Sequence, residues 1–346
     1  MKFTAEARGE GQGAKRFSVL AHILIVVSFI SCLAPLTAMA VRVDDYPVLR
    51  QFMAEMESKY EFDPIEMTGW FEQVEIREDI IEAIRRPREN LPWHEYRKSF
   101  VNDDRMRRGV EFWKAHAEVL ARAETQFGVP PEIVAAIIGV ETRYGHQAGR
   151  YRILDALATL TLRYPERSDF FRKEMGEYLL LSRELGVNPL SLRGSYAGAM
   201  GAPQFISSSY RRYAVDFNGD KKRDLIASID DAIGSVANYL KQNGWRQGEP
   251  IIGEVKLDGG LYTTLENPSL QPRLTLKQLS QYGILPVEPL DGRKLATLIT
   301  LEGEDGPVYR LGYTNFYVIT RYNRSTNYSM AVVELSRALR ERFDTQ

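Results

Sequence analysis

Cysteine is almost absent from this chain of 346 residues, with Cys32 as its single example. Because Cys32 lies in an apolar N-terminal stretch, the chain beyond residue 40 offers no disulfide, no thiolate zinc site and no cysteine nucleophile. The fold must therefore depend on burial of an apolar core, which about 300 residues can supply. The length suggests about two domains, or one domain with an insertion.

An excess of charge of either sign is also missing. Beyond residue 40 the chain keeps 41 of its 45 basic and 44 of its 46 acidic residues, a formal net charge of −3. This balance gives no reason to expect nucleic acid or anionic lipid as a partner. Internal repeats and low-complexity tracts are absent as well, and the composition is that of a soluble globular protein.

The first forty residues have the composition of an export signal. A basic start is followed by the mostly apolar residues 19–36 and by Ala38-Met39-Ala40, a small-x-small site that predicts cleavage before Val41. An uncleaved membrane anchor is one alternative, since the apolar run nearly reaches spanning length. Lipidation at Cys32 is another, although the residues before it match a lipoprotein cleavage box poorly. We rank free export first, a lipoprotein second and an anchor third.

Apolar spacing predicts a mainly α-helical chain with a small β-rich section late in the sequence. The predicted helices are residues 48–53, 64–73, 78–85, 105–127, 153–162, 170–185, 229–243 and 329–342. The predicted strands are residues 250–257, 296–301, 308–311 and 316–320, with a short helix at 275–281. Residues 92–97 are predicted to form an aromatic-rich link, and His116 to be a hydrogen-bonded core residue.

Residues 128–145 predict the most unusual helix. Two prolines suit its first turn, Gly145 suits a left-handed stop, and the unbroken apolar run 133–140 predicts burial on all sides. Glu141 stands at the far end of this helix, where desolvation and the negative end of the helix dipole both favour a raised pKa. A carboxyl group that stays protonated near neutral pH can act as a general acid. Alternatively, Glu141 leaves the core and pairs with Arg143 or another surface cation; the segment alone weighs the two interpretations equally.

Residues 194–205 are rich in glycine and alanine, which allows close backbone approach to a helix or to a flat ligand. Ser195 and Gln204 can supply hydrogen bonds, while Met200 and Phe205 can form a hydrophobic floor. Small polar groups beside apolar faces suit sugar rings. Tight helix packing explains the same composition and is slightly preferred on this stretch alone.

Residues 322–328 lie between the last predicted strand and the last predicted helix. Tyr322, Asn323 and Tyr328 can form a wall of a sugar cleft. Ser325 or Thr326 could instead serve only as a helix cap.

Residues 216–224 place oxygen-bearing side chains at relative positions 1, 3, 5 and 9, which is the beginning of an EF-hand calcium loop. The expected ligands are Asp216, Asn218, Asp220 and the backbone carbonyl of Lys222. Position 6, normally glycine, is Lys221, and position 12, normally glutamate, is Ala227; Asp231 could close the site instead. A solvated Asp/Asn turn with basic neighbours is the alternative.

Together these segments resemble the soluble lytic transglycosylases of the lytic murein transglycosylase B type. The resemblance covers about residues 46–342, and its five segments occur in one order: 139–145, 194–205, 216–225, 231–239 and 315–330. It implies a mainly α (α+β) fold in the bacterial periplasm, with a lysozyme-like core, an additional helical domain and a small β-rich domain. The expected division is 1–40 signal peptide, 41–120 helical domain, 121–247 catalytic core, 248–312 β-rich domain, and 313–346 return to the core.

The implied activity is cleavage of the β-1,4 bond between N-acetylmuramic acid and N-acetylglucosamine in peptidoglycan, leaving 1,6-anhydromuramic acid. Ordinary glycosidases need two carboxylates beside the bond. Here Glu141 is the single strong candidate, which suffices if the substrate's own acetamido group attacks C1. The alternative function is a catalytically inactive peptidoglycan-binding or scaffold protein.

The resemblance also implies roles for particular residues and partners. Ser195 would contact the acetamido group; the other expected substrate contacts are Met200, Gln204, Phe205, Tyr239, Tyr322, Asn323, Tyr328, Arg167 and Tyr96. A structural Ca²⁺ would be held by Asp216, Asn218, Asp220, Lys222 and Asp231, and the chemistry would need no cofactor. We expect a monomer that binds glycan strands, with other cell-wall enzymes as further candidate partners.

Overall fold

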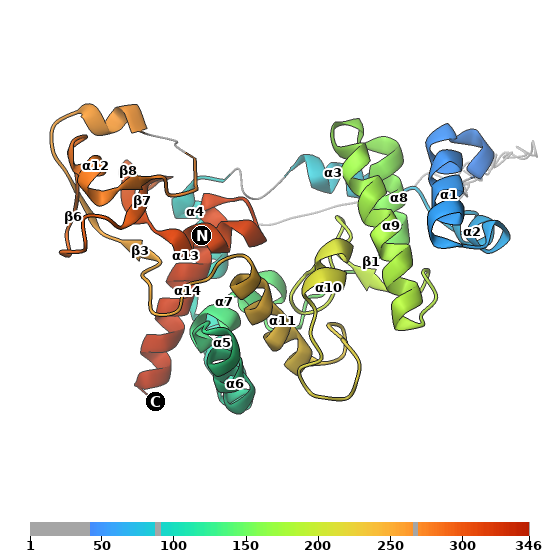
Figure 1. The fold of residues 1–346 in the computed structure, drawn as a ribbon, viewed down its shortest axis with the longest axis horizontal. Helices are drawn as coiled ribbons and strands as arrows, with labels where there is room; N and C mark the ends of the chain where they lie inside the picture. Colours follow the sequence, from blue (N-terminus) through green and yellow to red (C-terminus); the bar gives the residue numbers. More distant parts are fainter. Residues whose placement is uncertain (1–41, 87–90, 266–268, 346) are drawn as a thin grey trace, which may run out of the picture. The chain divides into compact units, whose positions relative to one another are not determined.

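The computed structural model describes residues 42–86, 91–265 and 269–345 (Figure 1). The predicted signal, its cleavage site and Cys32 lie outside the described residues. Within the described ranges, no helix has both the length and the apolar character needed to cross a bilayer.

Helices make up most of the described chain, which confirms the mainly α fold class. They are α1 (Pro47–Tyr60), α2 (Pro64–Phe71), α3 (Glu78–Arg85), α4 (Trp93–Phe100), α5 (Asp103–Ala115), α6 (Ala117–Phe127), α7 (Pro131–Thr142), α8 (Ile153–Arg163), α9 (Ser168–Leu185), α10 (Ser207–Tyr213), α11 (Ile229–Gln242), α12 (Leu276–Ser280), α13 (Thr314–Tyr322) and α14 (Thr326–Asp344).

The strands are short and form small antiparallel sheets. One pairs β1 (Tyr151–Arg152) with β2 (Arg193–Gly194), and another pairs β4 (Val255–Leu257) with β6 (Ile284–Pro286). The largest has the order β3 (Ile252–Gly253), β8 (Pro307–Gly312), β7 (Leu295–Glu302), β5 (Leu274–Thr275).

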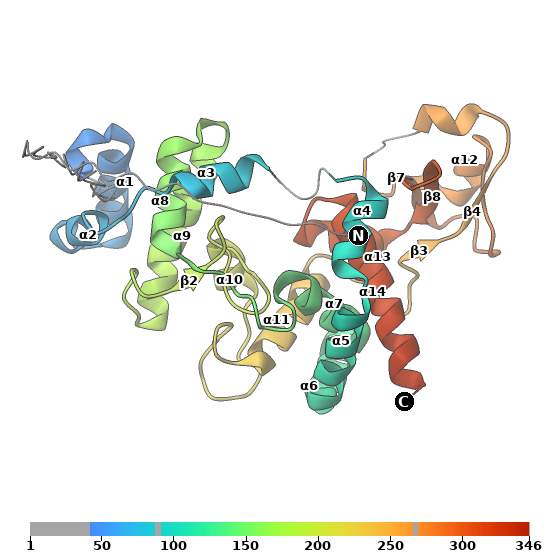
Figure 2. The same cartoon turned by 180° about the vertical axis from the view of Figure 1, so that it is seen from behind.

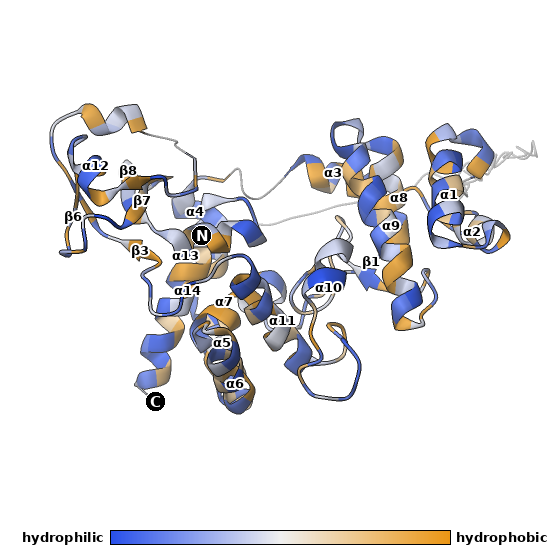
Figure 3. Cartoon of the chain, in the orientation of Figure 1, coloured by the Kyte–Doolittle hydropathy of each residue, from blue (hydrophilic) through white to orange (hydrophobic). Residues whose placement is uncertain are grey.

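The main core is built around α7. Every residue from Ile133 to Val140 is buried, as the unbroken apolar run predicts, and a fully buried Ile or Val contributes about 1.5–3 kcal/mol. Helices α5, α6, α11 and α14 pack against α7, and the reverse view shows α14 beside α5 and α7 (Figure 2). Figure 3 shows the apolar character of α7 and the hydrophilic character of the loop that precedes α11.

A second helical group leads toward the glycine-rich segment. Helices α8 and α9 form an antiparallel pair, with α3 on α8 and α10 on α9. Asp155 on α8 accepts a hydrogen bond from the backbone N–H of Glu75, and Thr159 accepts one from that of Arg77. Strand β1, just before α8, pairs with β2, just before Ser195, and so fixes where the segment 194–205 begins.

Two helix predictions need correction. Residues 105–127 do not form one helix: the chain breaks at His116 (φ −122°, ψ 26°), because α5 packs on α14 while α6 packs on α11. His116 itself is half-buried, with its ring 4.7 Å from that of Phe112. The predicted link 92–97 is helix α4, whose buried Trp93, Tyr96 and Phe100 do pack.

One strand prediction is wrong and another is right only in part. Residues 316–320 belong to helix α13, where Phe316, Ile319 and Thr320 share a buried face at helical spacing. A short run rich in β-branched residues does not separate a strand from a buried helix. The predicted strand 250–257 is two short strands, β3 and β4, which belong to different sheets.

Candidate active site

Glu141 lies in the last turn of α7, half-buried. Pro130 is the residue before the helix and Pro131 its first residue, as expected of prolines at a helix start. The left-handed residue that ends α7 is Arg143 (φ 50°), so the predicted stop at Gly145 is wrong. The left-handed turn thus comes two residues before Gly145, the position at which the sequence predicted it.

The hydroxyl group of Tyr328 donates a hydrogen bond to Oε1 of Glu141, with an O···O distance of 2.6 Å. Tyr328 is buried near the start of α14, and burial, followed by the charge of Glu141, raises the pKa of its hydroxyl well above the usual value. The tyrosine therefore stays a protonated donor. Arg143, the alternative partner considered for Glu141, lies beyond the helix end with an exposed side chain.

Aromatic rings from three separate segments gather beside Tyr328. Tyr322 stacks on Tyr328 with ring centroids 6.4 Å apart and 11° between planes. Tyr239 of α11 and Phe205 each contact the Tyr322 ring, at 4.9 and 5.7 Å. The Tyr322 hydroxyl donates to the carbonyl of Pro203 at 2.5 Å, which ties α13 to the glycine-rich segment. Burial raises the pKa of Tyr239 to about 12, so this hydroxyl too stays protonated.

The segment 194–205 is held by its own polar side chains. Oγ of Ser195 accepts hydrogen bonds from the N–H groups of Ala197 and Ala199. Gln204 adopts a left-handed conformation (φ 50°) and donates from Nε2 to the carbonyls of Ala148 and Gly201. Both polar side chains remain half-buried at the surface of this turn.

The apolar residues of this segment lie beneath that turn. Met200 and Phe205 are buried and pair through their backbones. The close approaches permitted by glycine are to the chain itself: a Cβ on Gly198 would lie 2.7 Å from Leu157 of α8, and one on Gly201 would lie 2.1 Å from the carbonyl of Leu225. The packing interpretation thus explains the glycines, while Ser195 and Gln204 remain at the surface.

Thr142 joins this segment to the end of α7, a link that sequence reasoning missed. Its Oγ1 donates to the carbonyl of Ala202 at 2.8 Å and accepts from the N–H of Gly145. The signal available in the sequence was a hydroxyl residue directly after Glu141. The bond places the Ser195–Gln204 turn next to the helix end that carries Glu141.

The remaining predicted contacts occupy different positions. Tyr96 is buried on α4 and contributes to the raised pKa of Tyr328. Asn323 follows α13 and is half-buried. Arg167 directly precedes α9, and its guanidinium lies 4.4 Å from the ring centroid of Phe170.

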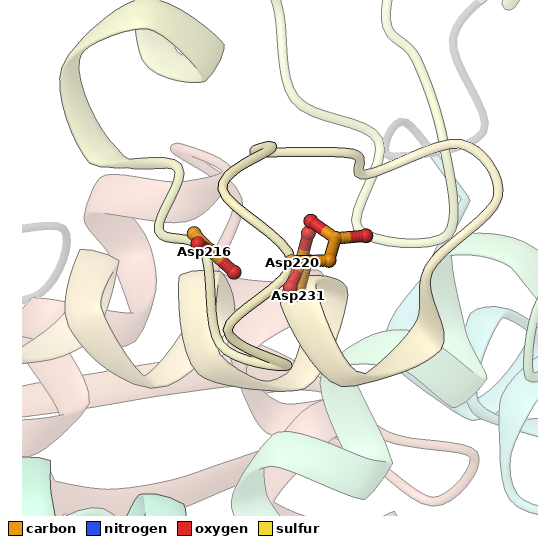
Figure 4. Close-up of side chains that lie close together, drawn as sticks. All are labelled: Asp216, Asp220 and Asp231. Carbon is orange, nitrogen blue, oxygen red and sulfur yellow. The ribbon is translucent and has the colours of Figure 1, made fainter.

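The loop before α11 brings three aspartate side chains close together (Figure 4). Carboxylate oxygens of Asp216, Asp220 and Asp231 lie within 4.8 Å of one another. Lys221, at the position normally held by glycine, takes the left-handed conformation itself (φ 70°). This hard-oxygen donor set fits Ca²⁺.

Internal hydrogen bonds hold the loop in this shape. Asp216 accepts the N–H groups of Gly219 and Lys221, and Asn218 accepts that of Asp220. Buried Asp231 accepts three backbone N–H groups, from Phe217, Asn218 and Asp224. Lys222, expected to offer its carbonyl, donates its N–H to Asp220.

Comparisons with known proteins identify the family of this chain. The sequence model of the family described as Transglycosylase SLT domain matches residues 44–337. The chain therefore belongs to this family, and the enzyme class expected from the sequence, a lytic transglycosylase, is confirmed.

Individual relatives cover most of the chain. It is 40% identical over 303 residues to membrane-bound lytic murein transglycosylase B of Escherichia coli (strain K12), which spans 85% of this chain and 82% of that protein. The catenated lytic transglycosylase SltB1 from Pseudomonas aeruginosa has a TM-score of 0.82 at 46% identity, covering 86% of this chain and 98% of that chain. The lytic transglycosylase Slt35 from Escherichia coli in complex with calcium has a TM-score of 0.79 at 38% identity, covering 89% and 97%.

Proposed function

We propose that this chain cleaves the β-1,4 bond between N-acetylmuramic acid and N-acetylglucosamine in peptidoglycan without water, leaving 1,6-anhydromuramic ends. One observation carries the proposal: a single carboxyl group, Glu141, ends a buried helix and is held by a tyrosine hydroxyl at 2.6 Å. The name of the Escherichia coli relative, a lytic murein transglycosylase, supports the substrate.

The proposed mechanism uses Glu141 twice. As an acid it protonates the leaving glycosidic oxygen while the acetamido oxygen of muramic acid bonds to C1 of the same sugar. The resulting carboxylate then accepts the proton of the C6 hydroxyl as that oxygen bonds to C1 and displaces the acetamido oxygen. Glu141 ends as it began, so the cycle consumes no water. The hydroxyl of Tyr328 stabilises the carboxylate formed between the two steps.

The other buried carboxylates of the described ranges support a single-acid mechanism. Asp155 is held by Arg152 at 2.7 Å, and Glu174 accepts both the N–H and the hydroxyl of Ser208. Asp231 is held by the N–H groups of the calcium loop. Each of these buried groups has a structural task in its own element, so none of the three is available as a second acid beside Glu141.

We assign the glycan cleft to the surface formed by the Ser195–Gln204 turn and the aromatic group Phe205, Tyr239, Tyr322 and Tyr328. Because Oγ of Ser195 already accepts two N–H groups, its own O–H points to a different partner, which we assign as the acetamido oxygen. Asn323, Tyr96, Arg167 and the buried Met200 complete the set as peripheral or supporting contacts.

We place the enzyme in the periplasm, because its substrate class lies there. Export by a cleavable signal, lipidation at Cys32, the domain division at 120, 247 and 312, and a monomeric state stay predictions. A structural Ca²⁺ held by Asp216, Asn218, Asp220, Lys222 and Asp231 is part of the proposal, and the solved calcium complex of Slt35 supports it.

Digestion of purified sacculi followed by mass spectrometry tests the function. We expect wild-type protein to release muropeptides with anhydro ends, and Glu141→Gln to lower the rate by at least about 100-fold, since one amide replaces the proton donor. Glu132→Gln is the matched control: it makes the same substitution at the other end of α7, where Glu132 pairs with Arg340 at 2.7 Å.

The products distinguish the alternatives. Reducing ends would mean that water attacks and would overturn the non-hydrolytic mechanism. Binding of sacculi without release would favour the inactive binding or scaffold protein. Retained activity in Glu141→Gln, with Glu132→Gln unchanged, would remove Glu141 from the mechanism.

A further inference from the structure

We propose that Arg105 is a positioning residue for the reaction: from α5 it holds the last turn of α7 and so sets the direction of the Glu141 carboxyl. The proposal rests on the transglycosylase function proposed above. Three features support it: the contacts of Arg105, the position of Tyr144 just past the helix end, and the two glycines that make room for the Tyr144 ring.

The guanidinium of Arg105 is buried against the end of α7. Its Nη1 donates to the carbonyls of Gly139 and, at 3.5 Å, Val140, and its Nη2 donates to the carbonyl of Ser99. The last carbonyls of a helix carry its negative end, so a buried cation there is favourable. The central carbon of the guanidinium lies 5.1 Å from the centroid of the Phe100 ring, a cation–π contact that adds to its hold on this side chain.

The turn after Glu141 has a strained backbone, and a hydrogen bond to Arg105 stabilises it. Arg143 and Tyr144 both have left-handed backbones (φ 50° and 62°), a conformation that costs about 1 kcal/mol or more for each non-glycine residue. The Tyr144 hydroxyl donates to the backbone carbonyl of Arg105 at 2.9 Å. Arg105 thus donates to α7 through its side chain and accepts from the following turn through its backbone.

Two glycines make room for this contact. A Cβ on Gly109 of α5 would lie 2.3 Å from the Tyr144 hydroxyl oxygen, and one on Gly139 of α7 would lie 2.6 Å from its ring. The ring therefore fills a slot between α5 and α7 that any larger residue at either position would close. The slot fixes how far the chain turns after Glu141.

Glu141 lies between two restrained neighbours. The carbonyl of Val140 faces Arg105, and the Thr142 hydroxyl is bonded to the carbonyl of Ala202 in the substrate turn. Arg105 itself is only 6% exposed and so has almost no surface with which to bind a glycan. Its loss should misdirect the acid without weakening glycan binding. A displacement of about 1 Å at a reacting group lowers a rate by about 100-fold.

Steady-state kinetics on a soluble glycan oligomer, together with thermal unfolding, tests the proposal. The variants are Arg105→Met, which removes the guanidinium, Arg105→Lys, which keeps a cation that reaches one carbonyl, and Tyr144→Phe, which removes one hydroxyl. The matched control is Arg183→Met. Arg183 also lies over a phenylalanine ring, that of Phe62 at 4.4 Å, and donates to a backbone carbonyl, but on α9.

We expect kcat to fall about tenfold or more in Arg105→Met with KM unchanged, to recover in part in Arg105→Lys, and to fall less in Tyr144→Phe. Arg183→Met should leave kcat unchanged and, because the Arg183 side chain is exposed, should change Tm little. If Arg105→Met does not fold, Tyr144→Phe carries the comparison with Arg183→Met.

Two results would overturn the positioning role: kcat retained in Arg105→Met and Tyr144→Phe, or kcat and KM changing together in both. An inactive wild type in the same assay would instead overturn the proposed function and this role with it. Activity in wild type and loss in Glu141→Gln confirm the function independently of Arg105.

Discussion

At the scale of single residues, the candidate site depends on the hydrogen bond between Tyr328 and Glu141. The two residues are 187 positions apart in the chain, yet their side chains share one short hydrogen bond. Glu141 was predictable as a candidate acid, because a lone carboxyl group at the end of an unbroken apolar run is costly to bury, although the segment alone equally allowed pairing with a surface cation. Its partner was not, because Tyr328 was recognised only as one of several aromatic residues in its segment.

Tyr328→Phe tests the contribution of that hydrogen bond. A hydrogen bond to a charged group contributes about 1.5–3 kcal/mol, so we expect kcat to fall about tenfold or more while the fold is kept. The measurement is the rate of anhydro-muropeptide release together with Tm.

Tyr178→Phe is the control for this substitution. Tyr178 is also buried, and its hydroxyl donates to the carbonyl of Pro189 at 2.7 Å, away from α7. We expect this variant to lose stability but not kcat. Equal rates for Tyr328→Phe and wild type would mean that the hydroxyl does not stabilise the carboxylate.

Among the elements, the sequence predicted those whose pattern is local. Helix α7 and its burial follow from the apolar run and the prolines, and strands β7 and β8 from short runs bounded by turns rich in glycine or aspartate. The break at His116 was not predictable in this way, because it depends on α5 and α6 packing on different helices. Helix α13 was wrongly predicted as a strand. Its short apolar run fits either a strand or a buried helix, and packing against α11 and α14 favours the helix.

In the loop 216–224, both the match to the EF-hand template and the two departures from it can be compared with the structure. Lys221 departs from the expected glycine, but its backbone takes the left-handed conformation that glycine would supply. Position 12 is not supplied by Ala227; instead Asp231, one turn into α11, lies with Asp216 and Asp220. The spacing predicted the candidate ligands Asp216 and Asp220, and the start of α11 brings the third carboxylate, that of Asp231, next to them.

Chelation tests whether this loop binds a cation. A ligand that binds only the folded state stabilises it by about 2.7 kcal/mol at a hundredfold excess over Kd, so EDTA should lower Tm and added Ca²⁺ should restore it. Cleavage should continue at temperatures below the lowered Tm, because the proposed mechanism uses no metal.

Asp220→Asn should reduce this Ca²⁺-dependent rise in Tm, since it removes one charge from the cluster while keeping an oxygen. Asp230→Asn, adjacent to the cluster but outside it, should keep the full rise. Identical melting curves with EDTA and with Ca²⁺ would argue against a bound cation.

On the scale of the whole molecule, β7 joins the β-rich section to the main core. Its residues Ala296 and Leu298 belong to the apolar cluster of the β-rich section, together with Leu311. The alternate residues Ile299 and Leu301 belong to the main cluster. Because successive side chains of a strand point to opposite faces, the strand is buried on both sides, and α4 and α14 contact it.

Because the two clusters share this strand, we expect the described parts of the chain to unfold as one cooperative unit, although 248–312 was expected to be a domain of its own. Ile299→Ala should lower the free energy of unfolding by about 2–5 kcal/mol and shift near-UV circular dichroism and loss of activity to the same lower temperature. Val287→Ala, at a side chain 56% exposed in the β-rich section, should change it by about 0.5 kcal/mol or less. Two separate transitions, with activity surviving the first, would show instead that the β-rich section unfolds alone and that β7 contacts the main core without coupling to it.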